Sequence, residues 1–255
     1  MQLLLALDDR TGTLAEIHRR LQRRFGPQGP FHLLDPVSQL VMGLVGGRTH
    51  AKISRSAFEA LLRRFGGWEA VRDAPVGEIE TIIAAVTYAD AKARRLKAAL
   101  EAITRAHGRL TLDNLERLTV AAAIDWLERL PGVGRKVAAA TLNFSSLRKP
   151  ALVVDTHHLR VLRSLALVGP KADFRHAYDA MMALLPSDWS ATDLDEHHQL
   201  MKRLGQTFCR PAVPCCRHCP LRDLCPTATA DRDRRRTGQD RSPDVLGHEA
   251  RAHVA

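Results

Sequence analysis

The sequence predicts an all-α protein, and three observations support this. Apolar residues recur at helical spacing in one segment of the chain after another. Aromatic residues make up only 5% of the 255 residues, so Leu, Ala and Val supply most of the apolar surface, which favours helices. No segment shows the alternation of a convincing strand, and nothing repeats at a fixed period. A chain of this length can form one large domain or two small domains with real hydrophobic cores.

Helical stretches follow one another through the first half of the chain. The first spans residues 13–25, where Leu14, Ile17, Leu21 and Phe25 lie on one face. Its opposite face carries four arginines, which suit contact with DNA, but a solvated helix face is the favoured interpretation. Further helices are expected from residue 36 to the glycines at 46 and 47, over 51–65, over 78–86, over 87–107 and, as one or two helices, over 113–130.

The second half continues in the same way. Helices are expected over residues 137–144, 156–165, 174–185 and 193–208. The remainder, residues 227–255, has too little apolar content to pack against a core and is expected to be a disordered tail.

The chain is strongly basic, with a formal net charge of +10 and a sequence pI of about 9.9. Residues 227–255 hold almost equal numbers of basic and acidic side chains, so the excess charge belongs to the folded part. This favours a polyanionic partner, although a generally basic soluble protein has the same composition. No run is long enough to span a membrane, and all five cysteines lie between 209 and 225. Such clustering argues against a disulfide framework and favours the reducing cytoplasm.

One glycine-rich turn carries the main chemical signal. Residues 130–136 read L-P-G-V-G-R-K and lead into a helix, so backbone N–H groups at the helix start can meet a phosphate. Lys136 falls in the first helical turn, where the dipole and the neighbouring Arg135 disfavour its ammonium form and favour a nucleophilic amine. An apolar segment then leads into Asp155 at an expected helix N-cap. On chemistry alone, a phosphate-contacting Lys136 and a purely capping Asp155 explain these residues equally well.

L-P-G-V-G-R-K followed by V-D-T-H resembles the helix-hairpin-helix DNA glycosylases, and most closely the endonuclease III family. The resemblance covers about residues 30–226. It implies a two-lobed all-α fold with the active cleft between the lobes. One lobe would span residues 33–149 as a six-helix barrel containing the hairpin, and the other would combine residues 1–32 with 150–226 around an iron–sulfur cluster. DNA-contacting residues are then expected at Arg48 and at the hairpin positions Gly132, Val133, Gly134 and Arg135.

Four cysteines before the tail form the second strong motif. They are Cys209, Cys216, Cys219 and Cys225, with the spacing C-x6-C-x2-C-x5-C. Thiolates so close together imply a soft-metal centre, and chemistry alone leaves zinc and iron–sulfur open. The endonuclease III family carries this spacing for its four-iron four-sulfur cluster, so the resemblance implies a 4Fe-4S cofactor. Cys215 is left without a ligand role, and nearby arginines suit DNA phosphates.

The resemblance also implies a reaction, because family residues that match Lys136 and Asp155 carry it. The target nucleotide leaves the duplex, and a carboxylate such as Asp155 stabilises the oxocarbenium-like state as the glycosidic bond breaks. Lys136 then attacks the sugar C1′ to form a Schiff base, and β-elimination cuts the strand. Asp155 is also expected to help Lys136 lose its proton. His157 and His158 suggest a metal site, but the family's V-D-T-H motif assigns such a histidine to structure.

Two segments depart from the family pattern. Where endonuclease III reads roughly S-A-Q-A-T-D, with a glutamine that fills the gap left by the flipped base, this chain has Gly47 beside Arg48. Glycine cannot fill that gap, but the planar guanidinium of Arg48 can reach into it. Residues 87–90 also differ from the usual G-L-Y-N-S. Adenine-mismatch glycosylases of this fold need a glutamate before this loop, and residues 37–50 contain no carboxylate.

The leading hypothesis is therefore a base-excision repair enzyme with DNA glycosylase and AP-lyase activity, acting on oxidised pyrimidines in duplex DNA. An AP lyase or a glycosylase for another lesion is the alternative, because the departing loops remodel the pocket. A non-catalytic DNA-binding module is more remote, since both Lys136 and Asp155 are present. We expect a cytoplasmic, nucleoid-associated bacterial protein that acts as a monomer on double-stranded DNA with damaged bases or abasic sites.

Overall fold

The computed structural model describes residues 2–29 and 31–229, and the regular structure of these residues is helical apart from one isolated bridge between Leu34 and Ser145. The α-helices are α1 (Gln2–Phe25), α2 (Pro36–Gly46), α3 (Ala51–Phe65), α4 (Trp68–Asp73), α5 (Val76–Ile82), α6 (Ala89–His107), α7 (Val120–Glu128), α8 (Arg135–Asn143), α9 (Thr156–Ser164), α10 (Phe174–Met182) and α11 (Ala191–Thr207). Three short 3-10 helices are η1 (Asp113–Arg117), η2 (Cys216–His218) and η3 (Arg222–Leu224). The predicted all-α class is confirmed.

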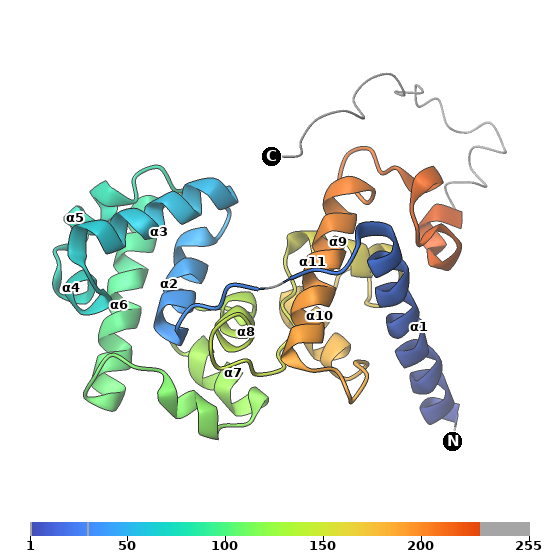
Figure 1. Ribbon diagram of the computed structural model, residues 1–255, viewed down its shortest axis with the longest axis horizontal. Coiled ribbons are helices and arrows are strands. Elements are labelled where there is room, and N and C mark those ends of the chain that lie inside the picture. The colour runs from blue at the N-terminus through green and yellow to red at the C-terminus, as the bar shows by residue number, and fades with distance from the viewer. Residues whose placement is uncertain (1, 30, 230–255) are drawn as a thin grey trace.

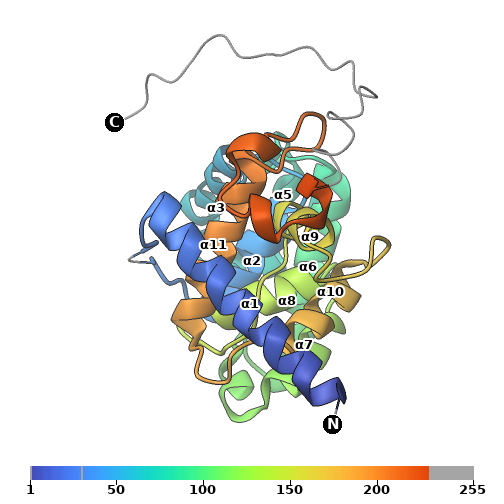
Figure 2. The ribbon, with the colours of Figure 1, turned by 90° about the vertical axis from the view of Figure 1, so that its right-hand side faces the viewer.

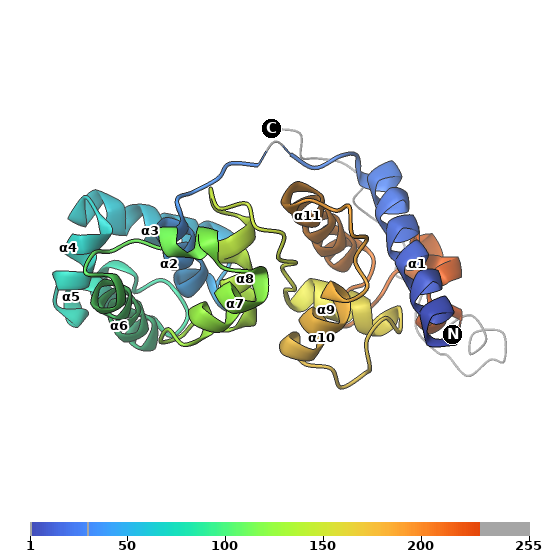
Figure 3. The same ribbon diagram turned by 90° about the horizontal axis from the view of Figure 1, so that it is seen from below.

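The helices form two lobes. Figure 1 shows α2 to α8 gathered in one lobe and α1, α9, α10 and α11 in the other, and the view from below separates the same two groups (Figure 3). Each lobe has its own hydrophobic cluster. One chain segment that joins the lobes precedes α2 and the other follows α8, and these segments meet where Ser146 N–H donates to Leu34 O at 2.9 Å.

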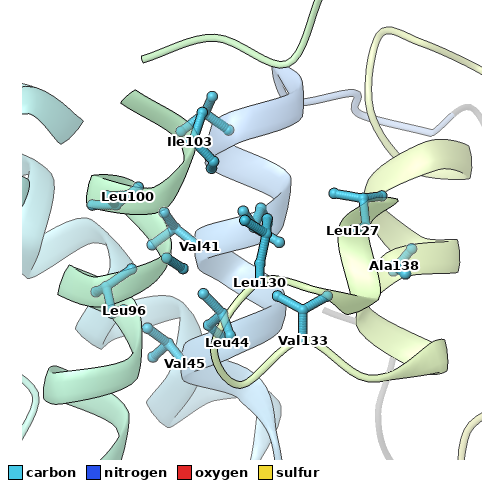
Figure 4. Packing of buried hydrophobic residues seen from close by; sticks show 14 of the residues in the cluster. Val41, Leu44, Val45, Leu96, Leu100, Ile103, Leu127, Leu130, Val133 and Ala138 are labelled. Carbon is cyan, nitrogen blue, oxygen red and sulfur yellow. The ribbon is translucent and has the colours of Figure 1, made fainter. Parts of the chain in front are cut away.

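The core of the first lobe lies between α2, α6 and the α7–α8 hairpin (Figure 4). Leucines from all three parts are buried, and each contributes about 1.5–3 kcal/mol by leaving water. From the turn of the hairpin, Leu130 and Val133 point into this core. The turn that precedes Lys136 is therefore fixed by packing.

Helix α8 makes packing contacts in both lobes. It packs against α2 and α7 in its own lobe and also contacts α10 and α11 in the other. Its crossing with α2 is close, because a Cβ placed on Gly43 would lie 2.8 Å from Val137 Cγ1. Lys136, directly before Val137, is thus placed by this close helix crossing.

The second lobe surrounds α11. Figure 2 shows α1 lying across the outside of α11, with the cysteine segment at one end. Three helices of this lobe begin at a side-chain cap: Asp155 for α9, Asp173 for α10 and Ser190 for α11. Such caps stabilise a helix by about 0.5–2 kcal/mol each, which explains why the sequence located these starts well.

The structure corrects three expectations about the elements. The first helix begins at Gln2 instead of at residue 13. Helix α4 was not expected, because the glycine pair at 66 and 67 signals a break; Gly67 in fact serves as the N-cap of α4. Residues 226–229 are helical and Ala228 is buried, so the expected tail starts too early, and its remainder, 230–255, lies outside the described residues.

No helix within the described ranges combines the length and the apolar character needed to cross a membrane.

Candidate active site

The hairpin turn presents the start of α8. Gly132 adopts φ +80°, a left-handed conformation that favours glycine, and a Cβ there would lie 3.0 Å from Arg95 Cβ. Gly134 is the N-cap of α8, and among the described residues no side chain caps this end. The N–H groups of the first turn are therefore available to an anion, as the sequence predicted.

Lys136 is exposed in the first turn of α8. Displacement of water by the surrounding protein lowers the pKa of its ammonium, Asp155 raises this pKa, and Lys202 of α11 lowers it further. The pKa of Lys136 is lowered overall, which increases the fraction of nucleophilic amine at a given pH. Asp155 thus opposes the deprotonation that it was expected to assist, at least through its charge.

Arg135, which was expected to contact DNA, makes ion pairs within the protein. Its guanidinium donates to Glu128 Oε1 at 3.2 Å and to Asp179 Oδ1 at 2.5 Å, and it stacks over the Tyr178 ring at 4.8 Å. Arg175 also pairs with Glu128, at 2.8 Å. Glu128 belongs to the hairpin and the other partners to α10, so this network ties the lobes together beside Lys136. The Arg135 charge is paired with carboxylates. The positive charge that lowers the pKa of Lys136 belongs to Lys202 and not, as expected, to Arg135.

Asp155 lies at the start of α9 in the second lobe. It is 7% exposed and caps α9, accepting the His158 N–H at 2.8 Å. Burial raises the pKa of this carboxyl, but interactions with His198, with His158 and with Lys136 lower it more, so the net direction is down. Asp155 is therefore a carboxylate across the physiological pH range, and it interacts electrostatically with Lys136 from the opposite lobe.

Buried histidines fix the backbone behind Asp155. The Nδ1 atoms of His158 and His198 lie 3.2 Å and 2.6 Å from Val153 O. Because a carbonyl can only accept, both rings carry a proton on Nδ1. Burial lowers the pKa of His158 to about 4 and that of His198 to about 3, so both rings are neutral near pH 7. His157, the histidine of the V-D-T-H motif, contacts Arg160 through Nδ1 at 3.2 Å.

A loop with unusual backbone presents Arg48. Arg48 is exposed with φ +54°, and Tyr88, in the adjacent loop, is 60% exposed with φ +59°. The loops are joined by Thr87, whose N–H donates to Thr49 Oγ1 at 3.1 Å and whose hydroxyl donates to Arg48 O at 3.0 Å. Sequence reasoning noted the altered loop but missed Tyr88 itself. The signal was a large aromatic residue directly before a helix in a chain with few aromatics.

The cysteine segment folds against the end of α9. Cys209 Sγ lies 3.5 Å from Ser164 Oγ, and Cys225 Sγ lies 3.3 Å from Ser164 O. Burial raises the pKa of the Cys219 thiol to about 11, and interactions with the other three predicted ligands raise it as well, whereas Cys215 makes no such contribution. Within residues 2–29 and 31–229, no three His, Cys, Asp or Glu side chains are arranged to bind a metal ion.

Comparisons with known proteins agree with this geometry. A family model for HhH-GPD superfamily base excision DNA repair proteins matches residues 41–187, more than half of the chain. The chain belongs to this family. The sequence-based resemblance to helix-hairpin-helix repair enzymes is thereby confirmed. The match includes the hairpin, Lys136 and Asp155.

Individual relatives extend the likeness. Endonuclease III of Thermotoga maritima is 27% identical over 213 residues, which cover 83% of this chain and 92% of that protein. Endonuclease III-like protein 1 of Gallus gallus is 34% identical over 110 residues, which cover 43% of this chain and 38% of that protein. A solved structure of a trapped endonuclease III–DNA covalent intermediate has a TM-score of 0.72 at 20% identity, covering 87% of this chain and 98% of that one. The structural match shows a shared fold.

Proposed function

We propose that the protein is a bifunctional DNA glycosylase and AP lyase that acts on oxidised pyrimidines in duplex DNA. The observation that carries this proposal is the electrostatic interaction of two groups across the lobe junction. An exposed lysine with a lowered pKa, Lys136, interacts with a buried carboxylate, Asp155, whose pKa is also lowered. A nucleophilic amine beside a permanent carboxylate suits displacement of a base from a sugar.

The chemistry follows from these two groups. As the bond between C1′ and the base nitrogen breaks, the carboxylate of Asp155 stabilises the positive charge that develops on the sugar. The Lys136 amine forms a bond to C1′, and ring opening gives a protonated imine. Loss of a C2′ proton then expels the 3′ phosphate and cleaves the strand. Hydrolysis of the imine by water releases Lys136 and the unsaturated sugar end.

DNA is bound by the groups around this site. The first turn of α8 offers its N–H groups to a backbone phosphate, with Gly132, Val133 and Gly134 shaping the approach. Arg135 contributes through its backbone, because its guanidinium is engaged by carboxylates. Arg48, together with Tyr88, enters the stack that the flipped nucleotide vacates.

A four-iron four-sulfur cluster held by the four spaced cysteines is part of this proposal. Cys209, Cys216 and Cys225 each act electrostatically on the Cys219 thiol, which supports that ligand set. A thiol with a raised pKa becomes a thiolate ligand only beside strong positive charge, which bound iron supplies. The group would order a segment with few apolar residues and hold it against Ser164 of α9.

A second candidate keeps the enzyme class and changes the lesion. Gly47, Arg48 and Tyr88 stand at the loops that face the substrate, and they differ from the family pattern. An AP lyase or a glycosylase for another damaged base would use Lys136 and Asp155 in the same way.

The test is strand cleavage on a panel of duplexes that carry an oxidised pyrimidine, an oxidised purine, uracil or an abasic site. Wild type is expected to cut the first and the last. Asp155→Asn should lose base release, and it should stay folded because Asn caps a helix as well as Asp does. Asp173→Asn, which alters the corresponding cap of α10, is the matched control and should cut normally. Base release without strand cleavage by wild type would reject the lyase half of the proposal.

A further inference from the structure

Lys92 is a buried cation that the proposed reaction does not use. It lies in the first part of α6 and is 7% exposed. Burial lowers the pKa of its ammonium, and in the described part of the chain no carboxylate pairs with it. A lysine in this situation needs other compensation, because a buried unpaired charge is costly.

The compensation comes from the loop that carries Arg48. Lys92 Nζ donates to Val45 O at 2.6 Å, to Gly47 O at 2.7 Å and to Thr49 Oγ1 at 2.9 Å. An ammonium group has three N–H donors, so all of them are used. Val45 lies in the last turn of α2, where unsatisfied carbonyls and the negative end of the helix dipole favour a cation. Gly47, the C-cap of α2, has φ −56° and does not form the left-handed cap whose N–H groups satisfy the last carbonyls of many helices. The Lys92 ammonium donates to the carbonyls at this helix end instead.

The second loop is linked to the first through Thr49. The Lys92 backbone N–H donates to Tyr88 O at 3.0 Å, but this is the first helical hydrogen bond of α6, which does not depend on the side chain. Thr49 Oγ1 accepts from both Lys92 Nζ and the Thr87 N–H, so one hydroxyl joins the two loops. Left-handed backbone is costly for a non-glycine residue, and it persists only where the surroundings enforce it. Arg48 and Tyr88 are two such residues. The Lys92 ammonium bonds directly to the loop of Arg48 and, through Thr49, reaches the loop of Tyr88.

We propose that Lys92 is a positioning residue that holds Arg48 and Tyr88 in the conformation that opens the DNA duplex. This inference rests on the proposed function and assigns Lys92 to one step of it, the extrusion of the target nucleotide. Lys92 does not touch the reacting sugar, so it acts through the two exposed side chains.

The test compares two abasic-site substrates, using the full-length protein with its cluster. One substrate is a fully paired duplex, and the other has the abasic site inside a bubble of unpaired bases flanked by duplex. In the bubble the stack is already open, so no residue is needed to open it. For Lys92→Met, cleavage of the paired duplex should fall by about tenfold to a hundredfold, the range expected when groups that position substrate are displaced. Cleavage of the bubble substrate should stay within about twofold of wild type.

Three variants control this comparison. Lys97→Met removes another α6 ammonium, one that donates to Arg72 O away from these loops, and should match wild type on both substrates. Lys92→Arg retains the charge and several donors and should recover much of the duplex activity. Thr49→Val is the variant to use if Lys92→Met does not fold, because it removes the hydroxyl that joins the loops and should show the same duplex-specific loss.

The outcomes separate the two proposals. If wild type cleaves both substrates and Lys92→Met loses activity equally on both, or on neither, the positioning role is rejected while the proposed function stands. If wild type cleaves neither substrate, the proposed function fails and the role of Lys92 fails with it.

Discussion

At the scale of single residues, the environment of Lys136 determines its reactivity. Displacement of water by the surrounding protein and the charge of Lys202 lower the pKa of Lys136, and Asp155 partly opposes them. Asp155 keeps its own charge because hydrogen bonding and neighbouring groups outweigh the effect of burial. The amine and the carboxylate can therefore coexist in the states that the proposed reaction needs.

Lys202→Met tests this description. A neighbouring positive charge disfavours the ammonium form, so its removal should raise the pKa of Lys136 and move the rise of lyase activity to higher pH. Arg203→Met changes the net charge equally, but Arg203 bonds to Phe25 O and Gln28 Oε1, away from Lys136, and should leave the profile unchanged. The measurement is single-turnover cleavage of abasic DNA against pH. An unmoved profile for Lys202→Met would contradict the assignment.

Residues at this scale were only partly predictable. Lys136, Asp155 and the four cysteines lie in motifs with fixed spacing, so the sequence alone was enough to propose their roles. Lys202 and Lys92 influence the site from other helices, and nothing local marks a lysine as a neighbour across the fold. The ion pair between Arg135 and Asp179 could not be predicted, because Asp179 lies on α10 and only the tertiary structure shows where that helix packs.

At the scale of elements, the position of α8 depends on its close packing against α2. Gly43 allows this close approach, because Val137 Cγ1 occupies the space that a Cβ would take. Helix α8, which carries Lys136, is therefore positioned by Gly43, a residue with no part in the proposed chemistry.

Gly43→Ala should destabilise the protein by about 1–3 kcal/mol through overpacking, even though alanine favours the helix. Gly12→Ala is the opposite control: nothing lies within 4 Å of its added Cβ in α1, so stability should rise by about 0.5–1 kcal/mol. Urea denaturation measures both. Wild-type stability for Gly43→Ala would show that Val137 moves aside without cost.

Element boundaries were predictable where a side chain marks them. Asp155 and Ser190 cap their helices as local rules suggest, and α3 matched its expected range. Helix α4 was missed because a Gly-Gly pair signals a break, yet the second glycine caps a new helix that Trp68 anchors in the core. The tail boundary was misplaced because Ala228 packs on the second lobe, a contact that composition does not encode.

At the scale of the whole molecule, buried histidines join the parts of the second lobe. His18 of α1 and His197 of α11 stack at 5.5 Å, and His158 of α9 meets His197 edge-on at 5.6 Å. Burial lowers the pKa of all three. Because these rings stay neutral in the folded protein, the histidines of the unfolded chain take up protons at a higher pH than those of the folded chain.

The protein should therefore lose stability as the pH falls below about 6.5, with the loss continuing to about pH 4 for His158. One such group contributes on the order of 3 kcal/mol over that window. His158→Asn retains a donor toward Val153 O and should flatten the pH dependence, whereas His176→Asn, at an exposed site, should not. Urea midpoints at pH 7 and pH 5 measure this. The same loss in His158→Asn as in wild type would exclude His158 as the source.

The cysteine segment gives a second prediction at this scale. Cys209→Ser should abolish bound iron and visible absorbance and expose the chain after α11 to proteolysis, because a ligand is lost. Cys215→Ser should retain the iron and serves as the matched control. Retained iron in Cys209→Ser would refute the ligand set, and loss in Cys215→Ser would add a ligand to it.

The most direct measurement of the central claim is borohydride trapping on duplex DNA that bears an abasic site. An imine between Lys136 and C1′ is reduced to a stable covalent adduct, which mass spectrometry locates on the chain. Wild type is expected to give an adduct at Lys136, and Lys136→Gln is expected to give none. An adduct at another lysine, or no adduct from iron-loaded wild-type protein, would contradict the account.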